Sequence, residues 1–293
     1  MRFALFIGCN IPARAKQYEI SSRAVLERLD VDLVDSRRFN CCGYPLRNVD
    51  QRSFLLSAAK NLAVAEKEEL HILALCSCCW GSLKKAASLL DQDPALKTEV
   101  NRVLEKRGLR YEGKTEVKHL LTVLHRDVGL ERLKGSIVRP FTGIKIATHY
   151  GCHTLRPSDV TRFDDPVNPT LFDELVEATG AESVNWEKRL ECCGAPLLGI
   201  NDDLSMSLTA QKIGSGKEAG ADYLCTACPW CHLQFDWVQK EMIAGNGGGR
   251  PLPAVLYPQL LGLSMGIEGE QLGIGMNRID IRDLERFCAN SPR

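Results

Sequence analysis

Short apolar runs recur along the chain, each bounded by polar residues or glycine. Six of them have the length and composition of buried parallel strands, and they form two matching sets: residues 2–8, 31–35 and 71–75, then 145–151, 183–186 and 222–224. The first run of each set ends in Gly-Cys. The matching order predicts that one structural unit occurs twice.

Segments with a helical spacing of apolar residues follow these strands. They cover residues 23–29, about 53–70, 171–180 and about 204–219, and two later segments, 117–124 and 255–263, are also predicted as helices.

Alternating strands and helices are typical of βαβ units and a parallel sheet. We therefore expect an α/β fold with two tandem similar domains, each a small parallel sheet with flanking helices, related by a pseudo-two-fold axis. Glycine and proline interrupt the pattern near residues 134–143, which divides the chain into domains 1–138 and 143–293.

The cysteines repeat in the same way. Each half has a lone cysteine, an adjacent pair before a glycine after 31 or 39 further residues, and a Cys-x-x-Cys after 33 or 34 more. Ten of the 13 cysteines fit this scheme: Cys9, Cys41, Cys42, Cys76 and Cys79, then Cys152, Cys192, Cys193, Cys228 and Cys231. Sites in parallel sheets form at the carboxyl ends of the strands. We therefore expect the five thiols of each half to meet at one edge of a sheet.

Composition narrows the range of possible functions. The 37 basic residues balance 37 acidic ones, and no basic stripe interleaves with aromatics, which argues against a nucleic-acid partner. No apolar run is long enough for a transmembrane segment, and the N-terminus does not resemble a secretion signal. We expect a cytoplasmic protein, in which patterned thiols bind metal or do redox chemistry more often than they form disulfides.

The thiol set by itself leaves three kinds of site open. A structural zinc takes four ligands, but neighbouring side chains of an extended backbone diverge, so an adjacent cysteine pair suits zinc poorly. An ordinary [4Fe–4S] cube also takes four thiolates, one fewer than each half offers. The pattern favours an iron–sulfur site, with zinc and a thiol–disulfide relay as the alternatives.

The repeated motif resembles the CCG domain found in the B subunits of heterodisulfide reductases. The resemblance runs from Phe3 to about Gly266. It implies two non-cubane [4Fe–4S] clusters as cofactors, each held by five cysteines, with a substrate disulfide cleaved between them. Carried over, it assigns the five cysteines of the first half to one cluster and the five of the second half to the other.

The resemblance also implies partners. No flavin or nicotinamide fingerprint is present, so electrons must come from other proteins of a complex. In the family these are a ferredoxin-like iron–sulfur protein of the C type and a flavoprotein of the A type, and any contact with a membrane is made through such partners. The substrate is a small-molecule or protein-bound disulfide or thiol. The alternative is an electron-transfer subunit of a lactate-, glycerol-phosphate- or quinone-linked complex, without a disulfide substrate. A zinc-stabilised scaffold is a third hypothesis.

Other residues gain a role only from their neighbours. His153 follows Cys152, where the first half has Asn10, and an imidazole there could protonate a leaving thiolate, so we assign it a catalytic role. The three cysteines outside the repeat are expected to be buried fillers: Cys78, Cys225 and Cys288.

The glycines, prolines and cations near the cysteines are expected to shape the backbone or to lie on the surface. Gly43 and Gly194, with Pro45 and Pro196, are expected to turn the chain around the site. Five cations close to the cysteines in sequence are expected to be solvated individually, with cluster charge balance or anion binding as the other interpretation: Arg14, Arg47, Lys60, Arg156 and Lys212.

Overall fold

The computed structural model describes residues 1–245 and 249–290, and this part of the chain contains two four-stranded parallel sheets. The first has the order β2-β1-β3-β4, formed by β1 (Arg2–Phe6), β2 (Asp32–Val34), β3 (His71–Ala74) and β4 (Val117–His119). The second repeats it as β6-β5-β7-β8, formed by β5 (Lys145–His149), β6 (Glu182–Val184), β7 (Tyr223–Thr226) and β8 (Ala254–Leu256). The prediction of an α/β fold with two similar halves is confirmed.

Helices connect and cover the strands of both sheets. In the first half they are α1 (Asn10–Arg14), α2 (Lys16–Arg28), η1 (Tyr44–Leu46), α3 (Gln51–Lys67), α4 (Ser77–Gln92), α5 (Pro94–Glu105), α6 (Leu120–Thr122), η2 (Val123–Gly129) and α7 (Leu130–Gly135). In the second half they are α8 (Cys152–Leu155), α9 (Ser158–Thr161), α10 (Leu171–Glu177), η3 (Ala195–Leu197), α11 (Asp202–Glu218), α12 (Pro229–Leu233), η4 (Gln234–Val238), α13 (Gln239–Gly245), α14 (Tyr257–Ser264), η5 (Ile274–Met276) and α15 (Arg282–Asn290).

The two late helices predicted from sequence were partly wrong. The segments 117–124 and 255–263 each begin with the fourth strand of a sheet and turn into a helix only afterwards. Strands of three residues inside a longer apolar run cannot be separated from a buried helix by periodicity. Pairing with β3 and β7 decides the outcome.

Corresponding helices begin with the same capping device. The Asp50 carboxylate accepts a hydrogen bond from the Ser53 N–H at the start of α3, at 3.0 Å. The Asn201 side-chain oxygen accepts from the Leu204 N–H at the start of α11, at 3.1 Å. Such caps satisfy N–H groups that the first helical turn leaves free. These caps fix the first residues of α3 and α11, the helices that follow the two cysteine pairs.

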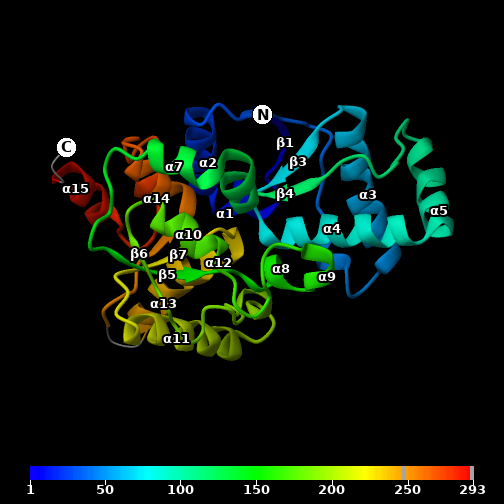
Figure 1. Ribbon diagram of the computed structural model, residues 1–293. Coiled ribbons are helices and arrows are strands. Elements are labelled where there is room, and N and C mark those ends of the chain that lie inside the picture. The colour runs from blue at the N-terminus through cyan, green and yellow to red at the C-terminus, as the bar shows by residue number, and fades with distance from the viewer. Residues whose placement is uncertain (246–248, 291–293) are drawn as a thin grey trace.

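The two halves pack closely on each other. Figure 1 shows the first sheet (blue and cyan) at the upper right and the second (green and yellow) at the lower left, with α4 and α8 meeting between them. The α2 helix packs on α14, and the buried Tyr18 hydroxyl of α2 donates to the Ala227 carbonyl at 2.7 Å. Ala227 immediately precedes Cys228. This contact places the end of β7 against the first half.

Candidate metal centre

The cysteines of each Cys-x-x-Cys motif lie where a strand turns into a helix. Cys76 follows β3 and is the N-cap of α4, and Cys228 follows β7 and is the N-cap of α12. Cys79 and Cys231 occupy the first turns of the same helices, and all four are buried. The helix N-termini favour negative charge, which suits thiolate ligands.

Each Cys-Cys-Gly sequence makes a turn that only glycine fits. Gly43 and Gly194 have φ angles of 82° and 92°, and each leads into a short 3₁₀ helix with proline in its first turn. A β-carbon on Gly194 would lie 2.5 Å from the Ser205 carbonyl oxygen. The Gly43 N–H donates to Cys41 Sγ at 3.5 Å, and the Gly194 N–H donates to Cys192 Sγ at 3.4 Å. The expected turn geometry is therefore present in both halves.

The helices behind these turns hold the cysteine backbone. In the first half Ser57 and Asn61 of α3 donate to the Cys41 carbonyl, at 2.7 and 3.1 Å. In the second half Thr209 of α11 donates to the Cys193 carbonyl at 3.1 Å. These hydrogen bonds fix the backbone from which the thiols extend.

The two cysteine sets meet between the sheets. The sulfurs of Cys76, Cys78 and Cys228 all lie within 4.8 Å of one another, so this group joins both halves. A second group of this kind brings His149 together with Cys193 and Cys231. The expectation that Cys78 is only a buried filler was incomplete, because its buried side chain lies in this group. The sequence signal for it was the Cys76-Ser-Cys-Cys79 run.

Hydrogen bonds between thiols separate the pKa values within each pair. In the first pair a hydrogen bond with Cys41 lowers the pKa of Cys42, and the same bond raises the pKa of Cys41. In the second pair a hydrogen bond with Cys152 lowers the pKa of Cys192, and a hydrogen bond with Cys192 in turn raises the pKa of Cys193. Each pair therefore contains one residue that readily becomes a thiolate, the form that binds metal.

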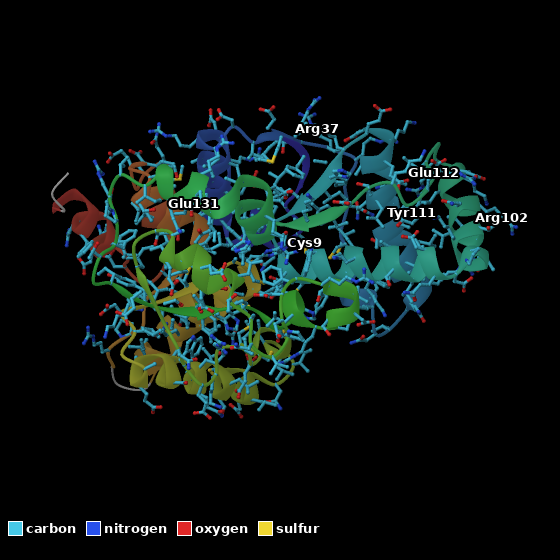
Figure 2. The ribbon with its side chains drawn as sticks, in the orientation of Figure 1. Cys9, Arg37, Arg102, Tyr111, Glu112 and Glu131 are labelled. Carbon is cyan, nitrogen blue, oxygen red and sulfur yellow. The ribbon has the colours of Figure 1, made fainter. Side chains whose placement is uncertain are left out.

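Cys9 is the most open member of the first set. Cys9 is exposed, yet a negative charge on its sulfur raises the pKa of Cys41. A β-carbon on the preceding Gly8 would lie 2.7 Å from Cys79 Sγ. Figure 2 shows Cys9 near the middle of the molecule, far in this view from Arg102 at the end formed by α5. Its counterpart Cys152 is partly buried at the start of α8. The structure thus gathers both predicted sets around the same region.

Histidines support the second set. His149, at the end of β5, has Nε2 at 3.3 Å from Cys231 Sγ, and burial lowers its pKa well below the ordinary value. A neutral imidazole in that position can donate its N–H to the sulfur. The corresponding residue of the first half is Phe6, so this contact occurs in one half only. The sequence by itself favours a structural or exposed His149 and gives no sign of this sulfur contact.

A cavity of about 410 Å³ opens directly onto the thiols. It is lined by Cys78, Cys152, Cys193, Cys228 and Cys231, together with Tyr44, His153, Leu198, Ile200 and Trp230. No carboxylate is among its lining residues in the described part of the chain. A small molecule in this cavity would touch sulfur atoms of the second set and that of Cys78 from the first half.

His153 lies at the wall of this cavity, as its place beside Cys152 suggested. Its Nε2 is 3.1 Å from the Tyr44 hydroxyl, which belongs to the other half of the chain. Partial burial lowers the pKa of His153, and the nearby Arg47 cation lowers it further. The equivalent Asn10 is buried, and its side-chain nitrogen has no hydrogen-bond partner among the described residues.

Two further expectations have different outcomes. Cys225 is fully buried in β7, as expected for a packing residue, whereas the side chain of Cys288 lies outside the described residues.

The expectation of a solvated Lys212 was wrong. This residue is 1 % exposed, and its ammonium lies 4.7 Å from the Trp186 ring centre and donates to the carbonyls of Lys188 and Glu191, just before Cys192.

The donor set fits a thiolate-bound iron–sulfur group. The twelve cysteines with described side chains are free, eight of them are buried, and five lie in the two groups described above. Thiolate sulfur is the usual ligand of iron–sulfur clusters, and closely spaced buried thiols without disulfides are otherwise costly when charged. The charge of Lys212 and the backbone N–H groups would offset part of the negative charge of such a group.

Comparisons with known proteins agree with this geometry. A family model described as the cysteine-rich CCG domain matches residues 3–84 and 146–236. The chain is 36 % identical over 283 residues to the B subunit of the ferredoxin:CoB-CoM heterodisulfide reductase of Methanosarcina mazei, covering 95 % of this chain and 94 % of that protein. It is 35 % identical over 283 residues to the 8-methylmenaquinol:fumarate reductase membrane anchor subunit of Wolinella succinogenes, covering 96 % and 98 %.

A solved structure shares the fold. The crystal structure of a hypothetical protein from Helicobacter pylori matches with a TM-score of 0.75 and 19 % identity, over 96 % of this chain. The chain spans about half the length of that protein, 52 %. Within the described residues, no helix has both the length and the apolar character that a membrane crossing requires.

Proposed function

Since the chain belongs to the CCG family of cysteine-rich domains, we propose that it is the iron–sulfur subunit of a heterodisulfide-reductase-type complex and reduces, or in reverse forms, a disulfide. The observation that carries this proposal is the meeting of Cys76 and Cys78 from one half with Cys228 from the other, beside a cavity. A disulfide has two sulfur atoms, and a site to which each half of the chain brings a thiol can address both.

Each domain, 1–138 and 143–293, holds one non-cubane [4Fe–4S] cluster in this proposal. The ligands are Cys9, Cys41, Cys42, Cys76 and Cys79 for the first, and Cys152, Cys192, Cys193, Cys228 and Cys231 for the second. When bound, such clusters supply one-electron transfer. The overall reaction takes a disulfide, two electrons and two protons to two thiols, and the electrons come from partner proteins.

The chain's own residues bind the substrate and move protons. Leu198, Ile200 and Trp230 give the cavity an apolar wall beside the sulfur atoms, against which a substrate can pack. His153, when protonated, delivers a proton from Nδ1 to a departing thiolate, and the Tyr44 hydroxyl holds Nε2 and orients that ring from the other half. A positioned general acid of this kind contributes roughly 10²–10⁴-fold to a rate.

The similarity to subunits of larger complexes supports a role with partner proteins. The names of the Methanosarcina and Wolinella proteins describe subunits of larger reductases. We propose that the electron partners of this chain are a flavoprotein and a ferredoxin-like iron–sulfur subunit, in a cytoplasmic complex that reaches a membrane only through other proteins.

A second candidate is an electron-transfer subunit without a disulfide substrate. The observation that favours it is the similarity to the Wolinella anchor subunit over 96 % of this chain, and to lactate utilization protein A of Bacillus pumilus at 25 % identity over 238 residues. Neither protein's name mentions a disulfide. The cavity beside the thiols favours the first candidate, because a pure relay has no need of it.

The test uses protein purified without oxygen. Metal analysis should find mainly iron, and adding a thiol to the oxidised protein should produce an electron paramagnetic resonance signal broadened by ⁵⁷Fe. Mainly zinc would contradict both electron-transfer candidates. Iron without a response to any thiol or disulfide would favour the relay.

A further inference from the structure

The two thiol sets differ in the groups that lie behind them. In the second half the Lys212 side chain is buried, and its ammonium donates hydrogen bonds to the carbonyls of Lys188 and Glu191. Glu191 directly precedes Cys192, so a positive charge lies behind the second cysteine pair. Lys212 is the only lysine or arginine that is buried in the part of the chain described. The second set therefore has a fixed cation that is shielded from solvent.

The surroundings of Lys212 keep its side chain charged. Besides the two carbonyls, the ammonium contacts the face of the Trp186 ring, which attracts a cation. Burial lowers the pKa of Lys212 to about 8, against the opposing effect of negative charge on Cys193 and Cys231. A lysine with this pKa is still mainly protonated at pH 7. Lys212 therefore acts on these two sulfurs as a full positive charge.

A histidine adds a hydrogen bond to the same set. His149 Nε2 lies 3.3 Å from Cys231 Sγ. Burial lowers the pKa of His149 well below its ordinary value, so the ring is neutral, and with its proton on Nε2 it donates to the sulfur. A hydrogen bond to a ligand sulfur stabilises the electron-rich form of an iron–sulfur group and so raises its reduction potential.

The internal repeat shows that the first half lacks both features. Phe6 stands at the position of His149, three residues before the first cysteine of its set, and its ring has no N–H to donate. Lys60 stands at the position of Lys212, 16 residues before the Cys-x-x-Cys motif, but it is only partly buried. Solvent therefore screens the charge of Lys60 more than that of Lys212.

Other influences on the two sites nearly match or carry no charge. Each cysteine pair accepts one backbone N–H, from Gly43 at 3.5 Å and from Gly194 at 3.4 Å. Ser82, which acts on Cys42, offers only a neutral hydroxyl. Exposure of Cys9 lets solvent stabilise a reduced first site, but the thiol-lined cavity opens onto the second set as well. The buried cation and the imidazole are the difference that remains.

We infer that Lys212 and His149 raise the reduction potential of the second cluster above that of the first, so that the second cluster takes up the first electron from the partner protein. This rests on the proposed function, because it requires an iron–sulfur cluster in each half. A reduced cluster carries one more negative charge, which a nearby cation or hydrogen-bond donor stabilises. Each cluster takes one electron, and no bond forms or breaks in this step.

The order of reduction places the first electron beside the substrate site. Four of the five cysteines that line the cavity belong to the second set. Neither Lys212 nor His149 lines this cavity, so both act through the cluster and its ligands as positioning residues. Their effect is therefore visible in the potential of one cluster, without any substrate present.

The experiment is a redox titration of the anaerobically purified, iron-containing protein, followed by electron paramagnetic resonance. Wild type should show two reduction steps, and Cys193→Ala should lose or alter the one at higher potential. Lys212→Met should lower the higher potential by the equivalent of about a tenfold fall in the reduced-to-oxidised ratio, about 59 mV for one electron, and leave the lower potential in place. His149→Phe, which copies Phe6 of the first half, should shift the same step in the same direction.

Two further variants are the controls. Lys60→Met changes the equivalent position of the first half and should leave the higher potential unchanged. Lys212→Arg keeps the positive charge and should stay closer to the wild-type potential than Lys212→Met does, which a merely structural role does not predict. If Lys212→Met fails to hold iron, the shift in His149→Phe decides.

The outcomes separate this inference from the proposed function. A higher potential unchanged in Lys212→Met and His149→Phe, or a shift of the lower potential instead, would overturn the inference, while disulfide reduction by wild type would still stand. The expected shifts in a protein that reacts with no thiol or disulfide would support the inference and contradict the disulfide reaction. Wild-type protein that holds mainly zinc would overturn both.

Discussion

Tyr44 and His153 contact each other across the two halves of the molecule. The Tyr44 hydroxyl lies 3.1 Å from His153 Nε2, and the rings meet edge to face with centres 5.2 Å apart. Burial raises the pKa of Tyr44, so its hydroxyl stays protonated and can donate to the neutral imidazole. One half of the chain thereby controls the ring orientation of the proposed acid on the other half.

Replacing this histidine tests its role as a proton donor. His153→Asn should retain iron and lower disulfide reduction by about 100-fold or more, the usual loss for a general acid. Tyr44→Phe removes only the orienting hydroxyl and should lower turnover by up to about tenfold, the size of one hydrogen bond. Iron content and anaerobic turnover are measured for both variants. Wild-type turnover in His153→Asn would leave this residue as a packing element.

Single cysteine variants test the two ligand sets. Cys42→Ala and Cys193→Ala should each lose or alter the cluster of one half and leave the other, as measured by iron content and spectra. Cys225→Ala, at a fully buried position within β7, is the control and should keep its iron. Cys78→Ala should also keep it, because the ten repeated cysteines complete both sets. Iron loss in Cys78→Ala would make Cys78 a ligand and contradict our assignment.

The turn after the second cysteine pair should depend on glycine. Gly194→Ala forces a side chain into a left-handed conformation and places its β-carbon 2.5 Å from the Ser205 oxygen, so we expect a loss of about 2–4 kcal/mol in the free energy of unfolding. Gly199→Ala has a similar φ of 83° with nothing within 4 Å of the added carbon, and should cost about 1 kcal/mol. Urea unfolding measures both. Equal losses would show that the contact with Ser205 relaxes freely.

Acid should destabilise the protein through His119. Burial lowers the pKa of this fully buried imidazole from 6.5 to about 4, so the folded state binds its proton more weakly than the unfolded chain. The stabilisation that the neutral His119 gives the folded state is present above pH 6.5 and is lost as the pH falls from 6.5 toward about 4. The expected loss from this group between about pH 7 and pH 5 is about 2 kcal/mol.

The matching variant is His119→Asn, which retains a side-chain acceptor for the Leu121 N–H and removes the titrating group. It should be less stable than wild type near neutral pH but lose less stability on acidification. Urea unfolding at about pH 5, 6 and 7 measures this. An identical pH dependence in the variant would assign the acid sensitivity to other groups.

The sequence by itself determined the repeated architecture. Strands that lead into Gly-Cys at positions 2–8 and 145–151, and similar spacings from the cysteine pairs to Cys76 and Cys228, predict two similar parallel sheets with thiols at their carboxyl edges. These features are local: they depend on the period of apolar residues and on backbone turns that glycine alone allows. The fourth strands, within 117–124 and 255–263, were missed because a strand of three residues gains its identity only from the neighbour with which it pairs.

Only the tertiary structure decided which side chains share the site. Nothing in the local sequence places Cys78 against Cys228, His149 against Cys231, or Arg47 beside Lys85. The Cys78–Cys228 contact arises from the docking of α2 on α14 and of α4 on α8, and docking depends on the complementary shapes of whole surfaces. The other two arise inside one half, where β5 pairs with β7 and where η1 packs on α4. Burial of Lys212 was likewise hidden, because a lysine is expected to be solvated until the packing of α11 brings it against Trp186. Short-range patterns specify elements, whereas burial and charge pairing are properties of elements already packed together.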